Sequence, residues 1–306
     1  MDKENTPLLC NVETGICESS ERSLNDFKYT EYTSTKKLIK VIYFTDPICS
    51  SCWGIEPQLR KMKSEYGNYI NIEYHMGGLL PDWSYNNGGI SKPFDVARHW
   101  DEVSLYYDMP IDGNVWLEEP LHSSYPPSIA FKAAQIQSSQ KAIVFLRELR
   151  EMVFLQKKNI TKIEYIKAAA ITAGLDEEKL ETDYEGIAKT HFKEDLNLAK
   201  LMGVRGFPSI VFQNSSGKTE FVYGFKPYSV YRNAISKLEP QIKASEYIQD
   251  WESLFTKYRS LTAREYAELS STERNEGEFF LNKLTDLGLL EKFVTKNGSI
   301  WKKVAK

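Results

Sequence analysis

The sequence predicts an α/β protein with a helical insertion and a small C-terminal α+β module, and three observations lead to this prediction. The first is an apolar, β-branched segment over 38–45 that runs into Cys49-Ser50-Ser51-Cys52 and then into a helical pattern. The second is Phe207-Pro208, which opens another β-branched segment far along the chain. The third is the long helix-rich stretch between the predicted strand at 69–76 and that proline.

The two cysteines at the end of the first strand form a dithiol that can close into a disulfide. Their spacing predicts Cys49 in the first turn of a helix over 50–66, where free backbone N–H groups and the helix dipole stabilise a thiolate. Such positions lower a thiol pKa from about 8.5 to between roughly 3.5 and 7.5. We therefore expect Cys49 to be the exposed attacking thiolate and Cys52 the buried resolving thiol.

Two further cysteines, Cys10 and Cys17, lie in a polar leader over 1–36. One alternative is a zinc site of all four thiolates, but six residues separate Cys10 from Cys17, which exceeds the usual C-x₂₋₄-C spacing. We therefore predict no metal and favour redox chemistry over zinc or a vestigial cysteine pair. Cys10 and Cys17 are either auxiliary thiols that exchange with the dithiol or incidental thiols of a flexible leader.

These motifs resemble the thioredoxin superfamily, whose cis-proline loop faces its dithiol. Pro57 stands where that superfamily has a helix-kinking proline, and the helix-rich stretch resembles the insertion of the DsbA family. The segments 75–80 and 124–128 are similar to its FrnE-like branch. The resemblance implies a thioredoxin fold with a DsbA-like helical insertion.

The resemblance also implies roles for Phe207 and Pro208. They would present backbone beside Cys49 and shape the groove in which a substrate strand pairs edge-on. Many relatives have a small or β-branched residue before this proline, so Phe207 is a departure. We expect this departure to narrow the choice of substrate.

The predicted organisation has three parts, with a winged-helix-like C-terminal module. The module shows helical segments at 247–259, 262–269 and 272–287, followed by a hairpin over 291–304 that turns at Asn297-Gly298. Its small excess of basic residues forms no stripe, so we expect no nucleic-acid binding. The parts are the leader (1–36), the DsbA-like domain (37–243, with its insertion at about 93–203) and the module (244–306).

The composition favours a globular chain, with 306 residues, 42% hydrophobic residues and a net charge of −3. No apolar run is long enough to span a bilayer, and the polar start lacks the apolar stretch of a signal peptide. We therefore expect a cytoplasmic protein without a membrane partner. Cytosolic disulfides are usually transient, catalytic or sensing, which favours reduction, isomerisation or sensing over disulfide installation.

The leading functional hypothesis is a thiol–disulfide oxidoreductase or isomerase that acts on protein disulfides through Cys49 and Cys52. It needs no metal or organic cofactor and takes electrons from an external thiol system. The alternative follows from a second resemblance, in 44–53 and in the form of the tail, to adapters that deliver the regulator Spx to the ClpXP protease. There the dithiol would be a redox sensor. A glutathione-dependent isomerase of the kappa class fits less well, because such enzymes ordinarily lack the complete dithiol.

Overall fold

The computed structural model describes residues 9–11, 16–18, 37–85 and 91–304. Its centre is a mixed sheet in the order β4-β3-β6-β7, in which β3 runs parallel to β4 and antiparallel to β6. Six of the seven residues of β3 are buried, as expected for a strand with neighbours on both edges and cover on both faces. The strands are β3 (Ile39–Thr45), β4 (Ile70–Met76), β6 (Ser209–Asn214) and β7 (Thr219–Tyr223).

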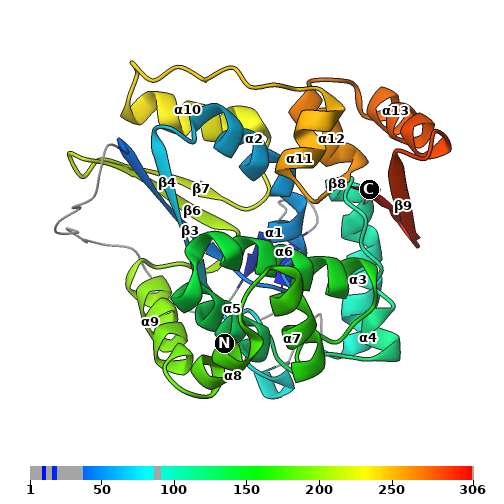
Figure 1. Cartoon of the computed structure of the whole chain (residues 1–306). Coiled ribbons are helices and arrows are strands. Elements are labelled where there is room, and N and C mark those ends of the chain that lie inside the picture. The colour runs from blue at the N-terminus through cyan, green and yellow to red at the C-terminus, as the bar shows by residue number, and fades with distance from the viewer. Residues whose placement is uncertain (1–8, 12–15, 19–36, 86–90, 305–306) are drawn as a thin grey trace.

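Helices cover both faces of this sheet. The helix predicted over 50–66 is divided at Ile55 into α1 (Ser50–Gly54) and α2 (Glu56–Tyr66), and Pro57 lies in the first turn of α2. Helix α2 lies with α10 (Tyr228–Leu238) on one side of the sheet, as Figure 1 shows.

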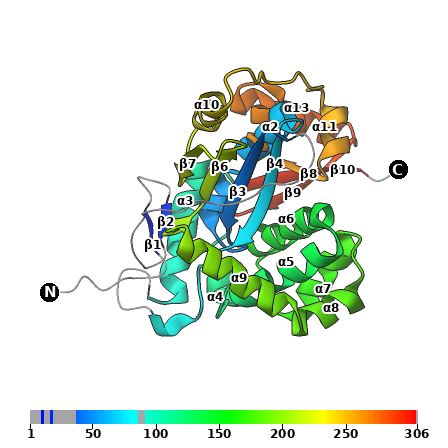
Figure 2. The ribbon, with the colours of Figure 1, turned by 90° about the vertical axis from the view of Figure 1, so that its left-hand side faces the viewer.

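The insertion supplies the helices of the other side, and α5 to α9 group beneath the sheet in Figure 2. Within the described part of the chain, none of the helices is both long and apolar enough to cross a membrane. The helical elements of the insertion and its entry are η1 (Trp83–Tyr85), α3 (Pro93–Tyr107), α4 (Val115–Glu118), α5 (Tyr125–Gln137), α6 (Ser139–Leu155), α7 (Ile163–Thr172), α8 (Glu177–Glu185) and α9 (Ala188–Leu201).

The C-terminal residues form a second unit with its own apolar core, built around Leu254, Leu261, Leu281 and Trp301. Its elements are the three predicted helices and the predicted hairpin, with one added strand, β8, that is too short to show a period in the sequence. The strands pair in the order β8-β10-β9. The elements are α11 (Trp251–Lys257), β8 (Ser260–Thr262), α12 (Ala263–Ser270), α13 (Arg274–Asp286), β9 (Leu290–Thr295) and β10 (Gly298–Lys303).

A third sheet involves the leader, for which the sequence predicts no strand. Its order is β1-β2-β5, where β1 is Leu9–Asn11, β2 is Ile16–Glu18 and β5 is Gly206–Phe207. Both pairings are antiparallel. Two short segments of the leader are therefore built onto the strand that precedes Pro208.

Candidate redox site

Cys49 is the N-cap residue of α1, one position before the turn in which the spacing predicts it. Its Sγ accepts a hydrogen bond from the backbone N–H of Cys52 at 3.2 Å, so the two cysteines close the first turn. Both are free thiols, and both side chains are 0% exposed. The prediction of an exposed Cys49 is therefore wrong.

Long-range contacts of Asp46 explain why the turn before Cys49 is buried. The Asp46 carboxylate accepts hydrogen bonds from the backbone N–H of Ile48 at 3.0 Å and of Leu79 at 2.8 Å, and from the Ser124 hydroxyl at 2.8 Å. Leu79 follows β4 and Ser124 precedes α5, so these bonds draw both segments over the turn. Burial raises the pKa of Asp46 to about 6, although the hydrogen bonds act in the other direction.

The two thiols have opposite pKa shifts. Burial raises the pKa of Cys49, and the hydrogen bond to Cys52 and the negative charge there raise it further. Burial also raises the pKa of Cys52, but the hydrogen bond from Cys49, the charge of Arg150 and a hydrogen bond with Thr45 outweigh it and lower the pKa overall. The environment thus favours a thiolate on Cys52 that is held by the Cys49 thiol, while the role of Cys49 as the attacking sulfur stays a prediction.

Arg150 is the cation of this site, and the sequence analysis did not identify it. It lies on α6, is fully buried, and pairs with Glu56 through an Nη1–Oε1 contact of 2.5 Å. Its Nη2 donates to the Thr45 hydroxyl at 2.6 Å and to the Asp46 carbonyl at 3.3 Å. Charged residues interleaved with the apolar residues of α6 are the one sequence signal that could have indicated it.

Helix α1 is fixed by aromatic residues around it. The hydroxyl groups of Ser51 and Tyr107 are hydrogen-bonded at 2.6 Å. Trp53 is 0% exposed, stacks on Phe154 and donates its Nε1–H to the Pro110 carbonyl at 3.0 Å. These contacts hold the helix that carries the dithiol in one position.

The Phe207–Pro208 peptide bond is cis, as the resemblance implies. Strand β6 begins directly after it, and Ser209 pairs with Phe44 near the end of β3. The register therefore brings the proline to the same end of the sheet from which the Cys49 turn emerges. The role of Phe207 and Pro208 in binding a substrate stays a prediction.

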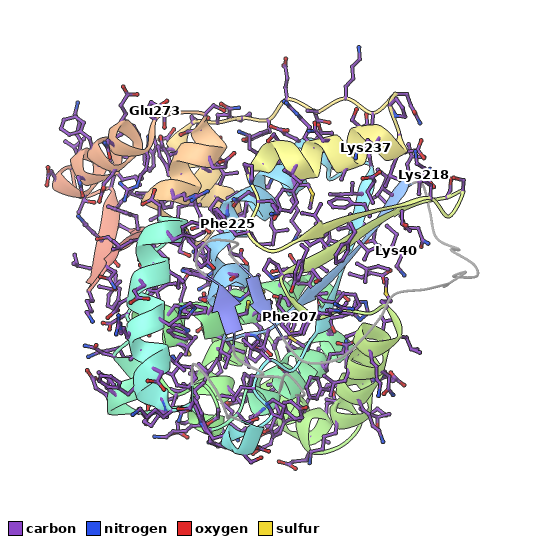
Figure 3. All side chains as sticks on the ribbon, turned by 180° about the vertical axis from the view of Figure 1, so that it is seen from behind. Lys40, Phe207, Lys218, Phe225, Lys237 and Glu273 are labelled. Atoms are coloured by element: carbon purple, nitrogen blue, oxygen red, sulfur yellow. The ribbon has the colours of Figure 1, made fainter. Side chains whose placement is uncertain are left out.

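The Phe207 side chain points inward rather than into a groove, being 1% exposed. A Cβ atom on Gly77 would lie 1.9 Å from its ring, so the ring occupies space that only glycine leaves free. A ring that is buried in this way offers no surface to a substrate, so the structure does not support the expectation that Phe207 narrows the choice of substrate. Figure 3 shows Phe207 beside the short leader strands, of which β2 pairs with its backbone.

The side chains of Cys10 and Cys17 lie outside those that the structure describes, so the four-thiol alternative stays untested there. Their backbones belong to β1 and β2, where the two residues are paired. Among the described side chains, no group of three or more His, Cys, Asp or Glu residues could hold a metal ion.

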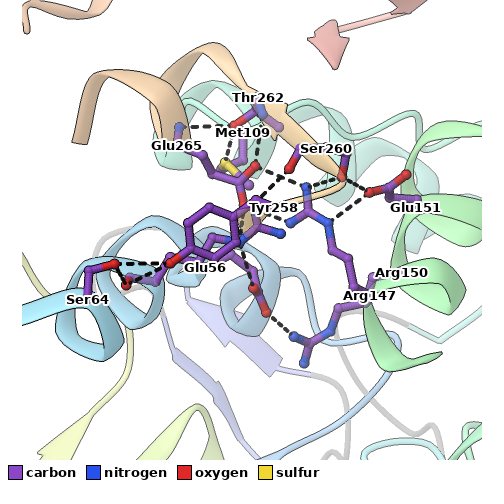
Figure 4. A network of polar contacts seen from close by, with 11 residues as sticks. Glu56, Ser64, Met109, Arg147, Arg150, Glu151, Tyr258, Ser260, Thr262 and Glu265 are labelled. Atoms are coloured by element: carbon purple, nitrogen blue, oxygen red, sulfur yellow. Dashed lines mark hydrogen bonds and ion pairs between the residues drawn. The ribbon is translucent and has the colours of Figure 1, made fainter. Parts of the chain in front are cut away.

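A buried charge network joins α6 to the C-terminal unit, as Figure 4 shows. Arg147 donates to both carboxylate oxygens of Glu265, at 2.7 and 3.0 Å, and to Glu151 at 2.9 Å. Arg60 of α2 donates to the Ser260 carbonyl at 2.8 Å and lies 3.3 Å from Glu265. The unit is thus docked by side chains from two helices that also surround the dithiol.

Comparison with known proteins places this geometry in a family. The sequence profile of the thioredoxin family matches residues 43–233. The chain is 35% identical over 300 residues to the ClpXP adapter protein SpxH of Halalkalibacterium halodurans, with 96% of each chain covered. It is 30% identical over 296 residues to the ClpXP adapter protein SpxH of Shouchella clausii, again with 96% of each covered. The chain therefore belongs to the thioredoxin family and, within it, to the family of the SpxH adapters.

The fold is also similar to that of the cytosolic disulfide reductase DsbM from Pseudomonas aeruginosa, with a TM-score of 0.53 and 18% identity. This likeness covers 65% of the present chain and 99% of the reductase. The predicted thioredoxin fold with a helical insertion is thereby confirmed. The likeness shows the fold and not an enzymatic activity.

Proposed function

We propose that this protein is an adapter that delivers the regulator Spx to the ClpXP protease and that Cys49 and Cys52 are its redox-sensing pair. The observation that carries the proposal is the extent of the similarity to the SpxH adapters. It covers 96% of the chain, so it extends into the C-terminal unit, whereas the reductase matches only 65%. The additional part is thus shared with adapters and not with the stand-alone reductase.

The docking of the C-terminal unit supports an adapter role physically. Arg147, Glu265 and Glu151 are nearly or completely buried, so desolvated, hydrogen-bonded charges lie at the centre of the interface, in addition to more exposed pairs such as Lys296 with Asp101. An adapter must hold its substrate and the protease in a fixed relative position. Because the C-terminal unit is docked rigidly on the redox domain, the two form one body that would bind both Spx and ClpXP.

The dithiol would make this body responsive to oxidants. On oxidation, the Cys52 thiolate and the Cys49 thiol lose two electrons and one proton in total and form a disulfide, which removes the negative charge beside Arg150. Arg150 contacts Glu56, and Glu56 lies 3.8 Å from Arg60 of the docking network. The redox state of the dithiol thus changes the charge balance next to the docked unit.

Reconstituted proteolysis tests the proposal. The rate of Spx degradation by ClpXP is measured without the chain, with the reduced chain, with the oxidised chain and with Cys49→Ser/Cys52→Ser. The reduced chain is expected to accelerate degradation, and oxidation is expected to change that rate only when the dithiol is present. The Cys10→Ser/Cys17→Ser chain is the matched control for loss of two cysteines. No acceleration by any form would refute the adapter role.

A second candidate is the thiol–disulfide oxidoreductase of the leading sequence-based hypothesis. The cap geometry of Cys49 and the lowered pKa of Cys52 beside Arg150 favour it. Its protein substrates would donate disulfides, an external thiol would supply electrons, and no cofactor is required. Insulin reduction by the chain that is lost in Cys49→Ser/Cys52→Ser, with Spx degradation intact, would show that the two activities are separate. Both functions would place the protein in the cytoplasm.

A further inference from the structure

Strand β5 is a short edge strand, and within the described part of the chain its partner is the leader strand β2. The register sets Cys17 opposite Phe207 and Glu18 opposite Gly206. An edge strand beside a dithiol is the place where an extended segment adds by main-chain pairing. A segment of this same chain therefore lies at the position expected for a substrate strand.

The leader strands also bring the two remaining cysteines together. Cys10 is the register partner of Cys17 in the antiparallel pair of β1 and β2. Directly opposed residues in such a pair have Cα atoms about 4.5 to 5.5 Å apart. This spacing falls inside the range of about 4.4 to 6.8 Å that disulfides span. The backbone thus presents a cysteine pair in disulfide register at the edge next to Pro208.

We propose that a Cys10–Cys17 disulfide is the intramolecular substrate of the Cys49/Cys52 dithiol, presented by β2 on the edge of β5. This inference rests on the redox role of the dithiol in the proposed function. It also means that a partner strand must displace β2 before it can pair with β5. The leader is therefore both a substrate and an occupant of the site.

The exchange balances without another reactant. Cys49 passes its proton to the Cys52 thiolate and attacks the Cys17 sulfur, so that a Cys49–Cys17 bond forms, the Cys10–Cys17 bond breaks and Cys10 leaves as a thiolate. Cys52 then attacks the Cys49 sulfur, the mixed disulfide breaks, and the Cys52 proton goes to the leaving Cys17. Two electrons move from the dithiol to the leader, which is reduced, while Cys49 and Cys52 are oxidised.

The register predicts which leader cysteine is attacked, and two full-length variants test it. Cys10→Ser/Cys52→Ser keeps Cys17 with Cys49, and Cys17→Ser/Cys52→Ser keeps Cys10 with Cys49. Each is oxidised with glutathione disulfide, and the cross-links are quantified by mass spectrometry. We expect the Cys17–Cys49 cross-link to exceed Cys10–Cys49 by about tenfold and to be independent of protein concentration, because a tethered partner has a high effective concentration.

Other results overturn the inference, and they distinguish its failure from that of the redox role. Equal yields of the two cross-links, or only glutathione on Cys49 in both variants, would show a reactive dithiol whose edge does not present Cys17. A Cys49 that reacts with nothing, including in the Cys10→Ser/Cys17→Ser chain, would refute the redox role as well. Each variant is checked for native circular dichroism, so that unfolded chains do not enter the comparison.

A kinetic measurement tests the electron transfer itself. The Cys10–Cys17 disulfide of the complete chain is reduced by glutathione, and its rate is compared with that in Cys49→Ser/Cys52→Ser. We expect the dithiol to accelerate this reduction about tenfold, because the tethered attack replaces a bimolecular one. Equal rates would overturn the proposal that the leader disulfide is a substrate.

Discussion

Two buried arginines of α6, three residues apart in the sequence, differ in the groups that neutralise them. Arg147 faces the C-terminal unit and contacts two carboxylates, Glu265 at 2.7 Å and Glu151 at 2.9 Å. Arg150 faces the dithiol and contacts one carboxylate, Glu56, together with neutral oxygens. Its buried Nε has no hydrogen-bond partner among the described residues.

This difference gives the two arginines different roles: Arg147 stabilises an interface, and Arg150 changes the pKa of a thiol. Around Arg147 two carboxylates contact the guanidinium directly, so the guanidinium and its partners satisfy one another and fix the docked unit. Around Arg150 the positive charge is less completely compensated, and it lowers the pKa of Cys52. One helix therefore links the redox site to the additional unit through residues one turn apart.

The largest expected effect follows removal of Arg147. Arg147→Met leaves Glu265 and Glu151 buried without their main cation, which should cost about 3 to 5 kcal/mol of unfolding free energy in urea titrations. Arg147→Met/Glu265→Gln removes one stranded charge and should recover part of the loss. A cost below about 1 kcal/mol would show that the network does not hold the interface.

Removal of Arg150 should act on the thiols instead. Arg150→Met is expected to raise the pKa of Cys52, because a charge of opposite sign is lost. The pH dependence of alkylation, resolved for each cysteine by mass spectrometry, measures this shift. Arg147→Met is the matched control, and an equal shift there would remove the distinction between the two arginines.

Asp46 should add a pH-dependent contribution to stability at the redox site. Its pKa of about 6 lies above the ordinary 3.8, so the folded chain holds this proton more tightly than the unfolded chain does. This contribution is present at low pH, declines by about 3 kcal/mol as the pH rises from about 4 to about 6, and is level above that. Asp46→Asn should lack this dependence, and unfolding titrations of both chains across the range measure it. Parallel pH profiles would contradict the assignment.

The smallest effect is expected at the outer edge of the docking network. Lys302 lies 2.8 Å from Glu151 but is 39% exposed, so Lys302→Ala should cost less than about 1 kcal/mol of unfolding free energy. Comparison with Arg147→Met in the same urea titrations shows whether burial sets the strength of these pairs. Equal losses would contradict that explanation.

The sequence predicted the parts of the fold that local pattern determines. The strand before Cys49, the helix after it and the proline before β6 carry short-range signals, and all were placed correctly. The three-residue strand β8 was missed because it is too short to show a period. The leader strands were missed because β2 forms by pairing with Phe207, far away in the chain.

The chemistry of the site was less predictable, since it depends on contacts between distant segments. The exposure of Cys49 was predicted wrongly because Asp46 binds Leu79 and Ser124, which cover the turn. Arg150 was missed for the same reason, because nothing near the cysteines in the sequence indicates a cation supplied by α6. The position of the dithiol at the start of a helix could thus be predicted from the sequence, while the charges that surround it could not.

Site-resolved titration of Cys49 and Cys52 in the complete, reduced chain measures which of the two thiols ionises first. We expect Cys52 to ionise first, below the pKa of an ordinary thiol, and Cys49 to keep its proton to well above that pKa. Ionisation of Cys49 first, with Cys52 protonated, would contradict the role assigned to Arg150 and restore the assignment made from the sequence.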